Sequence, residues 1–483
     1  MRHLVLRAIV ASSLLAACGH GDATGGAGSN APATTPTAPT VPTPGSAGSA
    51  PAAGSAAGSA AGAGAGPAAA AEPPKPAEPP PPPGHDFTPT AKLLLAVGAC
   101  EGPPPPDFPE ALLKKHCEGV NQAQTDYKDN WVKKAREFFA DKVPKTLPKT
   151  VVYPFAGGDL STALTVFPDA EEITTMSLEP AGDPRTLEAL LGSPVEMKAK
   201  PAKAKAAKAP AKGDKADKPD TADKPDAEEA KAKKIKPNPL LEKALGTIQS
   251  ELKFLYRVNF SNTANMITAM RVGELPTQLV FGLSALKVHG YEVVSLRYFR
   301  LDESGAIQYL TDDDVAKAPD PLKGRAATRN ELFSNAELRF RRPGGPVQTY
   351  RHIQQNLDDA HLKKDPRVIK HLEAKGTIAS MTKAASYLLS WDIFATMRDY
   401  LLKHTVWMVS DATGVAPKWG KPAGFEYETY GVFNFAHLKE GAVISPDWRK
   451  EWQSEPKRDL PFRFGYYDKQ SNNHLVIMRK KTS

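Results

Sequence analysis

A glycine turn and a following acid in this sequence have the spacing found in nucleotide-binding crossovers. Gly157-Gly158-Asp159 follows an apolar run over 150–155, and Glu179 follows a second apolar run, 22 residues after Gly157. In such crossovers the glycines let the backbone approach a phosphate, and the acid holds ribose hydroxyls. The sequence lacks G-x-G-x-x-G, however, and Asp159 would repel a phosphate. We therefore expect Asp159 to cap a helix and expect no bound cofactor.

A second acid follows another apolar run, over 405–409, where Asp411 and Thr413 lie in a turn. Ligands of α/β folds bind at the carboxyl ends of the strands, so Asp159, Glu179 and Asp411 could converge there. Such carboxylates could serve acid–base chemistry or a hard cation, whereas a lone turn aspartate more often forms an Asx-turn. The candidate pocket therefore comprises Gly157, Gly158, Asp159, Glu179, Asp411 and Thr413.

Other chemistries lack the spacing that they require. The histidines are scattered, with no H-E-x-x-H and no cysteine cluster, so we expect no metal site. No G-x-S-x-G surrounds Ser161 or Ser386. Lys383 and Arg398 lie in a predicted amphipathic helix, where solvated or capping roles are favoured. No residue is therefore assigned a catalytic role.

Segments with the two-residue period of a strand alternate along the chain with segments that have the 3.6-residue period of a helix, and these elements would position the candidate residues. Period-two and short apolar runs predict strands over 150–155, 173–178, 292–301, 336–342, 347–353, 405–409, 462–467 and 474–479. Helical spacing predicts helices over 127–139, 160–167, 240–256, 265–272, 276–289, 366–374 and 383–404. This alternation predicts an α/β fold, a Rossmann-like mixed sheet flanked by helices, with a C-terminal antiparallel hairpin from the last two strands.

The N-terminus has the pattern of an export signal. Arg2 and Arg7 precede an apolar run that ends in Leu15-Ala16-Ala17-Cys18. This ending resembles the lipobox of bacterial lipoproteins, which implies removal of residues 1–17 and acylation of Cys18. Gly19 then favours the outer membrane, with the lipid bilayer as partner. The alternative is an ordinary signal peptide with an incidental Cys18.

Two low-complexity segments divide the rest of the chain. Residues 19–86 are almost wholly Gly, Ala, Ser, Thr and Pro, which predicts a disordered tether because little apolar surface can be buried. Residues 198–236 hold thirteen lysines against seven acids and predict a solvated insertion. The globular α/β domain is then expected over 87–197 and 237–483.

Charge and cysteine content narrow the partners and the compartment. The net charge of +8 lies mostly in the leader and the insertion, so the folded part is nearly neutral and no nucleic-acid partner is expected. Acylation uses one of the three cysteines. The remaining Cys100 and Cys117 predict a disulfide in an envelope compartment, with two separately buried thiols as the alternative.

Four longer segments resemble a family of bacterial extracytoplasmic proteins and lipoproteins of unassigned function: YPFAGGDLSTALTVFPDAEEITTMSLEPAG (153–182), KAASYLLSWDIFATMRDYLL (383–402), SDATGVAP (410–417) and LPFRFGYY (460–467). The first also resembles the front half of an S-adenosylmethionine methyltransferase, whose sheet likewise ends in a hairpin. Neither S-adenosylmethionine nor NAD is expected outside the cytoplasm. The resemblances therefore imply a fold and a location without a reaction.

Three functional hypotheses follow from the sequence. The first is a membrane-anchored lipoprotein of the cell envelope that acts by binding an envelope component, a small polar solute or a protein partner. The second is an envelope hydrolase or transferase that uses Asp159, Glu179 and Asp411. The third is a degenerate nucleotide-binding fold with a structural role.

Overall fold

The structure is a computed structural model that describes residues 80–106, 108–192, 238–259, 275–322, 331–433, 445–464 and 473–481. These residues belong to one compact unit, Ala77–Ser483. Within them, no helix has both the length and the hydropathy needed to cross a bilayer. Cys18, residues 19–79 of the tether, the 198–236 insertion and the helix predicted over 265–272 lie outside the described residues.

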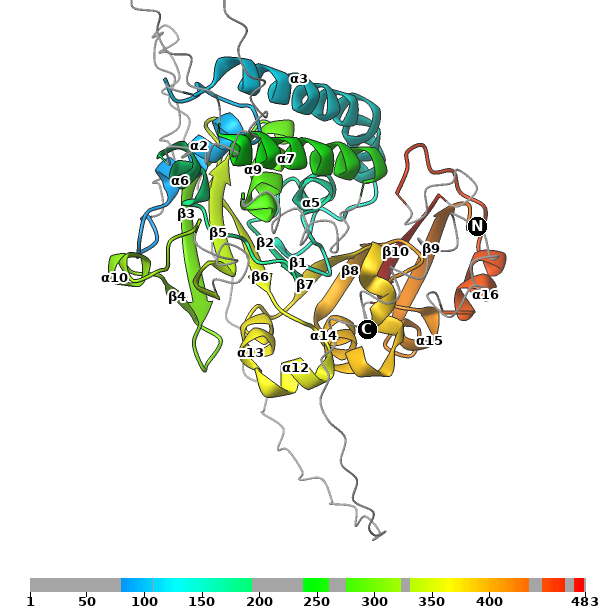
Figure 1. Ribbon diagram of the computed structural model, residues 1–483. Helices are drawn as coiled ribbons and strands as arrows, with labels where there is room; N and C mark the ends of the chain where they lie inside the picture. The colour runs from blue at the N-terminus through cyan, green and yellow to red at the C-terminus, as the bar shows by residue number, and fades with distance from the viewer. Residues whose placement is uncertain are drawn as a thin grey trace, which may run out of the picture. The chain divides into compact units, whose positions relative to one another are not determined.

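A mixed β-sheet forms the centre of the fold (Figure 1). Its strands are β1 (Thr150–Pro154), β2 (Glu172–Ser177), β3 (Glu292–Leu301), β4 (Ile307–Tyr309), β5 (Asn335–Arg341), β6 (Gln348–Gln354), β7 (Ile378–Thr382), β8 (Thr405–Ser410), β9 (Phe425–Gly431) and β10 (His474–Lys480). They pair in the order β4-β3-β5-β6-β2-β1-β7-β8-β10-β9.

The sheet has a parallel middle and antiparallel ends. Strands β6, β2, β1, β7 and β8 are parallel, and they follow the 3-2-1-4-5 order of doubly wound folds. At one end β5, β3 and β4 continue antiparallel, and at the other β10 pairs antiparallel with β8 and with β9. The predicted mixed α/β architecture is therefore present.

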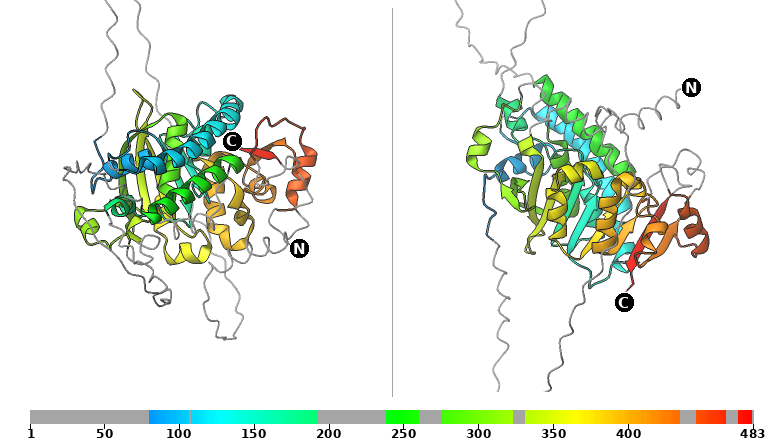
Figure 2. Two further views of the ribbon diagram at one scale, coloured as in Figure 1. Left: turned by 45° about the horizontal axis from the view of Figure 1, so that its top comes forward. Right: turned by 90° about the horizontal axis from the view of Figure 1, so that it is seen from below.

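The end of the sheet near the C-terminus differs in detail from the prediction. Strand β10 pairs with β9 over 425–431, and residues 462–464 are not in a strand. The chain supplies this partner from farther away, in β9, where the alternate residues Phe425, Tyr427 and Thr429 are buried on one face of the sheet and Tyr430 is buried on the other. Figure 2 shows β9 and β10 at the opposite end of the sheet from β3 and β4.

Helices cover both faces of the sheet (Figure 1). On one face lie α2 (Thr88–Val97), α3 (Glu110–Tyr127), the π-helix η1 (Lys128–Val132), α4 (Lys133–Ala140), α5 (Leu160–Val166), α6 (Thr186–Gly192), α7 (Pro239–Val258) and α9 (Thr277–His289). On the other lie α12 (Asp359–Lys364), α13 (Arg367–Glu373), α14 (Ala395–His404), α15 (Pro417–Gly420) and α16 (Asp447–Ser454). Short helices α10 (Asp312–Ala316), η2 (Glu331–Phe333), η3 (Ala384–Ser390) and η4 (Asp392–Phe394) fill connections.

Each face of the sheet has its own hydrophobic core, because successive strand residues point to opposite sides. On β1, Val151 and Tyr153 belong to the core beneath α5 and α9, whereas Val152 belongs to the core above α14. The helix α9 is buried all round, which suits a helix packed between the sheet and the outer helices α3 and α7. The site-bearing turns are thus held between two packed layers.

The predicted disulfide between Cys100 and Cys117 is present, with a Cα–Cα distance of 5.5 Å. It ties the loop after α2 to the body of α3. This link fixes the first two helices of the unit relative to each other.

The first described residues cover the free edge of β3. The backbone N–H of His85 donates to Leu310, and the N–H of Phe87 donates to Leu296. Beside them Asp86 forms an ion pair with Arg297. The chain therefore enters the folded unit at the β3–β4 edge of the sheet.

The single helix predicted over 383–404 is wrong. The segment instead begins with Lys383 in extended backbone, continues through the 3-10 helices η3 and η4, and forms an α-helix only from Ala395. The apolar periodicity misled because β7, which directly precedes Lys383, was not assigned as a strand. Ala384 then turns the chain with a φ of 56°, a left-handed value that ends the strand abruptly.

Candidate functional site

The strand order reverses between β1 and β7. From β1 the chain runs through β2 to β6 in one direction, and it then returns to β7 and β8 on the other side of β1. In open α/β sheets the crevice at the carboxyl edge of such a switch point is where ligands bind. We therefore expect a ligand site to include residues that follow β1, β7 and β8.

The turn after β1 is strained and ends in a capped helix. Phe155 has a φ of 59°, which is rare for a residue with a side chain. Asp159 then caps α5 by accepting from the backbone N–H of Thr162, and it also accepts from Tyr153 Oη at 3.1 Å. Burial raises the pKa of Asp159, against the opposing effects of the Lys383 charge and these hydrogen bonds. The predicted helix cap is thus present.

The turn after β7 and the turn after β8 are joined by a hydrogen bond. Asp411 accepts hydrogen bonds from the backbone N–H groups of Thr413 (2.9 Å) and Ala384 (3.2 Å), and from the Thr413 hydroxyl. It therefore forms an Asx-type turn, and it also fixes the left-handed turn at Ala384. Burial raises the pKa of Asp411, and these hydrogen bonds oppose the rise.

Lys383 is a fully buried amine between these two acids. Its side chain has no exposed surface, and its Nζ lies 4.6 Å from the centroid of the Phe464 ring. Burial lowers the pKa of Lys383 to about 8, while the charges of Asp159 and Asp411 oppose the change. The charge of this one amine is thus shared by two buried carboxylates.

Asn259, at the end of α7, also belongs to this group of buried polar residues. It ends α7 in the left-handed conformation, with a φ of 60°, and its backbone carbonyl accepts from Lys383 Nζ. In the side-chain orientation that satisfies its neighbours, its amide donates to Tyr127 and Thr162 and accepts from Trp131 Nε1 at 3.0 Å. A single residue therefore connects the buried charges to the outer helices.

These side chains form what we call the switch-point cluster: Tyr153, Asp159, Thr162, Asn259, Lys383, Asp411 and Thr413. Two of the three predicted acids, Asp159 and Asp411, therefore belong to it. Both carboxylates are at most 1 % exposed and are held by several donors. They act as fixed charges in a closed site, because neither could exchange a proton with a substrate without losing these hydrogen bonds.

Glu179, the third predicted acid, has a different environment. It has no exposed surface, and neither of its carboxylate oxygens has a hydrogen-bond partner in the described residues. Its backbone carbonyl accepts from His352, and Gln278 joins His352 to the carbonyl of Gly157 at 2.8 Å. The glycine turn is therefore bound by protein on this side.

An open pocket of about 610 Å³, which we call the aromatic pocket, lies against the switch-point cluster. Its wall includes a stack in which Tyr127 lies between Trp131 and Tyr256, with ring centroids 5.2 and 4.6 Å apart. Asn259 forms part of the same wall, so the pocket and the cluster share a residue. The π-helix η1 contributes Asn130 and Trp131, and such insertions are frequent at functional sites.

The charges around the aromatic pocket are mainly positive. Lys253 and Arg257 from α7 and Arg463 from the segment after α16 line it, against the single acid Asp126. Lys253 and Arg257 are exposed, so they can adjust to a ligand. The pocket thus combines a wall of nearly buried aromatic side chains with cations, a combination that suits an anion with an apolar or aromatic part.

Ser161 lies beside His289 but is not an activated nucleophile. Arg136 Nη2 donates to His289 Nδ1 at 2.7 Å, since a guanidinium has no acceptor. The proton of the ring is therefore on Nε2, which faces the carbonyl of Ser161 at 3.0 Å and cannot act as a base toward its hydroxyl. Burial lowers the pKa of His289 to about 3, so the ring is neutral.

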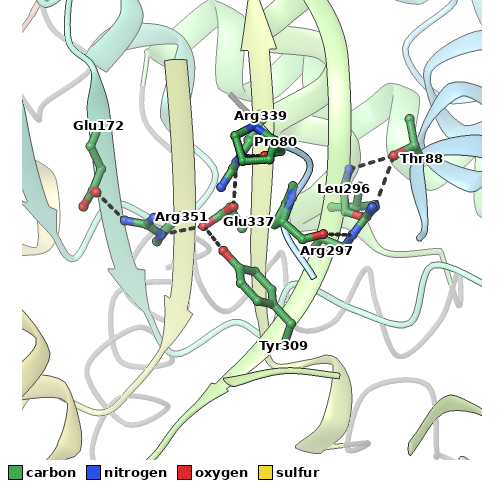
Figure 3. A network of polar contacts seen from close by, with 10 residues as sticks. Pro80, Thr88, Glu172, Leu296, Arg297, Tyr309, Glu337, Arg339 and Arg351 are labelled. Carbon is green, nitrogen blue, oxygen red and sulfur yellow. Dashed lines mark hydrogen bonds and ion pairs between the residues drawn. The ribbon is translucent and has the colours of Figure 1, made fainter. Parts of the chain in front are cut away.

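A second charged cluster spans several strands on the face of the sheet that α12, α13 and α14 cover (Figure 3). Arg351 joins Glu172 to Glu337, while Arg339 and Tyr309 also bind Glu337 at 3.0 and 2.8 Å. Lys375 adds a second cation to Glu172. Each of the three cations is paired with one or both of the two carboxylates, so we interpret this ion network as structural. No group of three or more metal-ligating side chains occurs in the described part of the chain.

Sequence reasoning missed Lys383 and Asn259 as members of the site. Lys383 could have been found if Ile378–Thr382 had been predicted as a strand, because Lys383 directly follows β7 in the way that Asp411 follows β8. For Asn259 the sequence offers only an asparagine near the end of a predicted helix, a common C-terminal cap, and its place in the cluster depends on how α7 packs.

No family model, no curated protein and no solved structure matches this chain.

Proposed function

We propose that this chain is a membrane-anchored lipoprotein of the cell envelope whose folded unit binds a small organic anion in the aromatic pocket. The observation that carries the proposal is the pocket of about 610 Å³ beside the switch point, lined by stacked aromatic rings and three cations. Its volume lies within the range of about 300–1,000 Å³ that is usual for ligand sites.

The switch-point cluster supports binding rather than hydrolysis. Asp159 and Asp411 are enclosed and already accept hydrogen bonds, so they hold Lys383 and Asn259 in place. Such a rigid base is what a binding pocket needs, because a preorganised wall loses little entropy when the ligand enters. A hydrolase would need one of these carboxylates to face the ligand.

Calorimetric titration of the full chain tests the ligand class. Cys18→Ser keeps the protein free of acyl chains, and phenyl phosphate and benzylamine serve as aromatic probes of opposite charge. We expect saturable binding of phenyl phosphate and no binding of benzylamine. Binding of phenyl phosphate should weaken with added salt, because the cations lie at the surface.

Arg257→Gln tests the site itself, with Arg449→Gln on α16 as the matched control outside the pocket. We expect Arg257→Gln to weaken phenyl phosphate binding about three- to tenfold, corresponding to about 1 kcal/mol for one exposed charge. The control should bind like the parent. Equal effects of the two variants, or preference for benzylamine, would contradict the proposed pocket.

Mass spectrometry of the membrane-extracted protein tests the anchor. The lipobox resemblance predicts a mature chain that begins at Cys18 and carries a diacylglyceryl group on its sulfur. A chain that keeps residues 1–17, or an unmodified Cys18, would remove the anchoring part of the proposal and leave the binding part standing.

A further inference from the structure

A second cavity lies at the end of the sheet where the parallel strands begin, next to the amino end of β1. It has a volume of about 450 Å³, and we call it the Arg136 groove. Its walls are apolar. Phe139 in α4 and Val143 in the loop after α4 form one part of the wall, and Val166 and Phe167 at the end of α5 form another. Val143 is only partly buried, so the groove presents apolar surface that no described residue fills.

Arg136 is the unusual group in this groove. Its Nη2 donates to the neutral His289, and its Nε is buried with no hydrogen-bond partner. No carboxylate forms an ion pair with Arg136 in the described residues. Burial lowers the pKa of this half-buried guanidinium, and the charge of Asp169 on the rim opposes the change only in part. A bound anion would therefore stabilise its positive charge.

The charges on the rim of the groove are also mainly positive. Lys145, Lys149 and Arg342 line it together with the single acid Asp169. Lys149 forms its ion pair with Glu171 at 3.0 Å, and Arg342 lies 3.7 Å from Asp169. Arg136 and the exposed Lys145 are thus the cations of the groove that form no ion pair in the described residues, and Arg136 is the one beside the apolar wall.

We propose that the Arg136 groove binds a long-chain fatty acid, with the carboxylate on the Arg136 guanidinium and the hydrocarbon chain against Phe139, Val143, Val166 and Phe167. The apolar walls suit a chain of methylenes, each of which contributes about 0.8 kcal/mol when it is buried. A guanidinium matches a carboxylate in shape and charge, so Arg136 suits the head group of such a ligand. This site is separate from the aromatic pocket and does not depend on the proposed function.

Competition with a fluorescent fatty acid, cis-parinaric acid, tests the proposal on the full chain with Cys18→Ser. Oleate, oleyl alcohol and phosphatidylglycerol vesicles serve as competitors, all below the concentration at which oleate forms micelles. We expect oleate to displace the probe at one site per chain, oleyl alcohol to compete at least about tenfold more weakly, and the vesicles not to compete. Equal competition by oleate and oleyl alcohol, or competition by vesicles alone, would overturn the proposal.

Variants separate the carboxylate contact from the apolar wall. Arg136→Gln should weaken oleate at least tenfold and leave oleyl alcohol unchanged, whereas Val143→Trp, which fills the groove, should weaken both. Lys149→Gln is the matched control, because its charge lies on the same rim but already pairs with Glu171. It should change oleate binding less than threefold.

Folding is checked by circular dichroism and thermal unfolding of every variant. Should Arg136→Gln not fold, the partly buried Val143 site still decides the question, because its substitution leaves the polar contacts of Arg136 in place. Oleate binding that survives Val143→Trp in a folded protein would refute the groove as the fatty-acid site.

Discussion

Lys383 is the residue on which the switch-point cluster depends. Its amine is enclosed with two carboxylates, and burial would be unfavourable for any of the three alone. The cluster therefore behaves as a unit whose members stabilise one another's charged forms.

Replacing Lys383 by methionine tests this interdependence. We expect Lys383→Met to lower the free energy of unfolding by about 3–5 kcal/mol, because two buried carboxylates lose their cation. Denaturant unfolding measures the change, with Lys134→Met on the exposed side of α4 as the control, expected within about 0.5 kcal/mol of the parent. Parent-like stability of Lys383→Met would show that the buried amine is uncharged.

Glu172 should make the stability depend on pH. Burial would raise its pKa, but Lys375 and Arg351 outweigh burial and lower the pKa of Glu172 to about 2. A carboxylate with a lowered pKa adds stability above the unfolded pKa of about 4.3, and this contribution is lost as the pH falls toward 2.

We therefore expect Glu172→Gln to cost about 2–3 kcal/mol at pH 7 and about half as much at pH 3. Unfolding curves at the two pH values give the difference. Glu171→Gln is a close control, since Glu171 is an exposed neighbour with a surface ion pair to Lys149 and should show no such pH dependence. A gap that stays constant between the two pH values would mean that the ion network does not hold Glu172 ionised.

At the scale of elements, α2 and α3 are held by a covalent link, and the disulfide closes a loop with a sequence separation of 17. The double variant Cys100→Ser with Cys117→Ser should unfold with about 3 kcal/mol less free energy than the parent, because the unfolded chain regains the entropy of that loop. Reducing agent should destabilise the parent by a similar amount and leave the double variant unchanged. An effect of reducing agent on the double variant would point to a different cause.

Most elements could be predicted from the sequence, because their apolar periodicity agrees with how they are buried. Strands β1, β2 and β3 and the β5–β6 hairpin lie close to their expected ranges, and Asp159 caps its helix as expected. Strand β7 was not predicted because Ile-Ala-Ser-Met-Thr holds only two large apolar residues, so it shows no continuous apolar run and no clear alternation. The pairing of β9 with β10 depends on contacts between distant segments, which local patterns do not encode.

The candidate site was harder to predict than the fold. The turn acids were visible because each follows a strand, but their conversion into a closed cluster depends on Lys383 and Asn259. The left-handed turns at Ala384 and Asn259 set those positions. An asparagine is common at a left-handed helix end, but alanine gives no signal of such a turn. Tertiary packing therefore decides the chemistry of the site.

At the scale of the whole molecule, the fold tolerates a long insertion between α6 and α7. The two helices pack together, and Asn238 Nδ2 at the start of α7 donates to the carbonyl of Leu190 at 3.2 Å. The ends that flank the insertion are therefore already joined.

Deleting residues 198–236 should leave the fold intact. We expect the free energy of unfolding to stay level or to rise by up to about 2 kcal/mol, because a shorter loop costs less entropy to close. A variant in which the same residues are replaced by an equally long Gly/Ser segment separates the effect of length from that of charge and should match the parent. A loss of more than about 2 kcal/mol on deletion would show that the insertion stabilises the unit.

The entry of the chain along β3 sets the geometry of anything attached upstream. Residues 85–87 join the unit at one edge of a sheet of ten strands, while β9 forms the opposite edge. With neighbouring strands about 4.8 Å apart, the two edges are separated by roughly 40 Å. A force applied to the chain at residues 85–87 would therefore act on one end of the sheet, and β9 would lie farthest from the point where the force is applied.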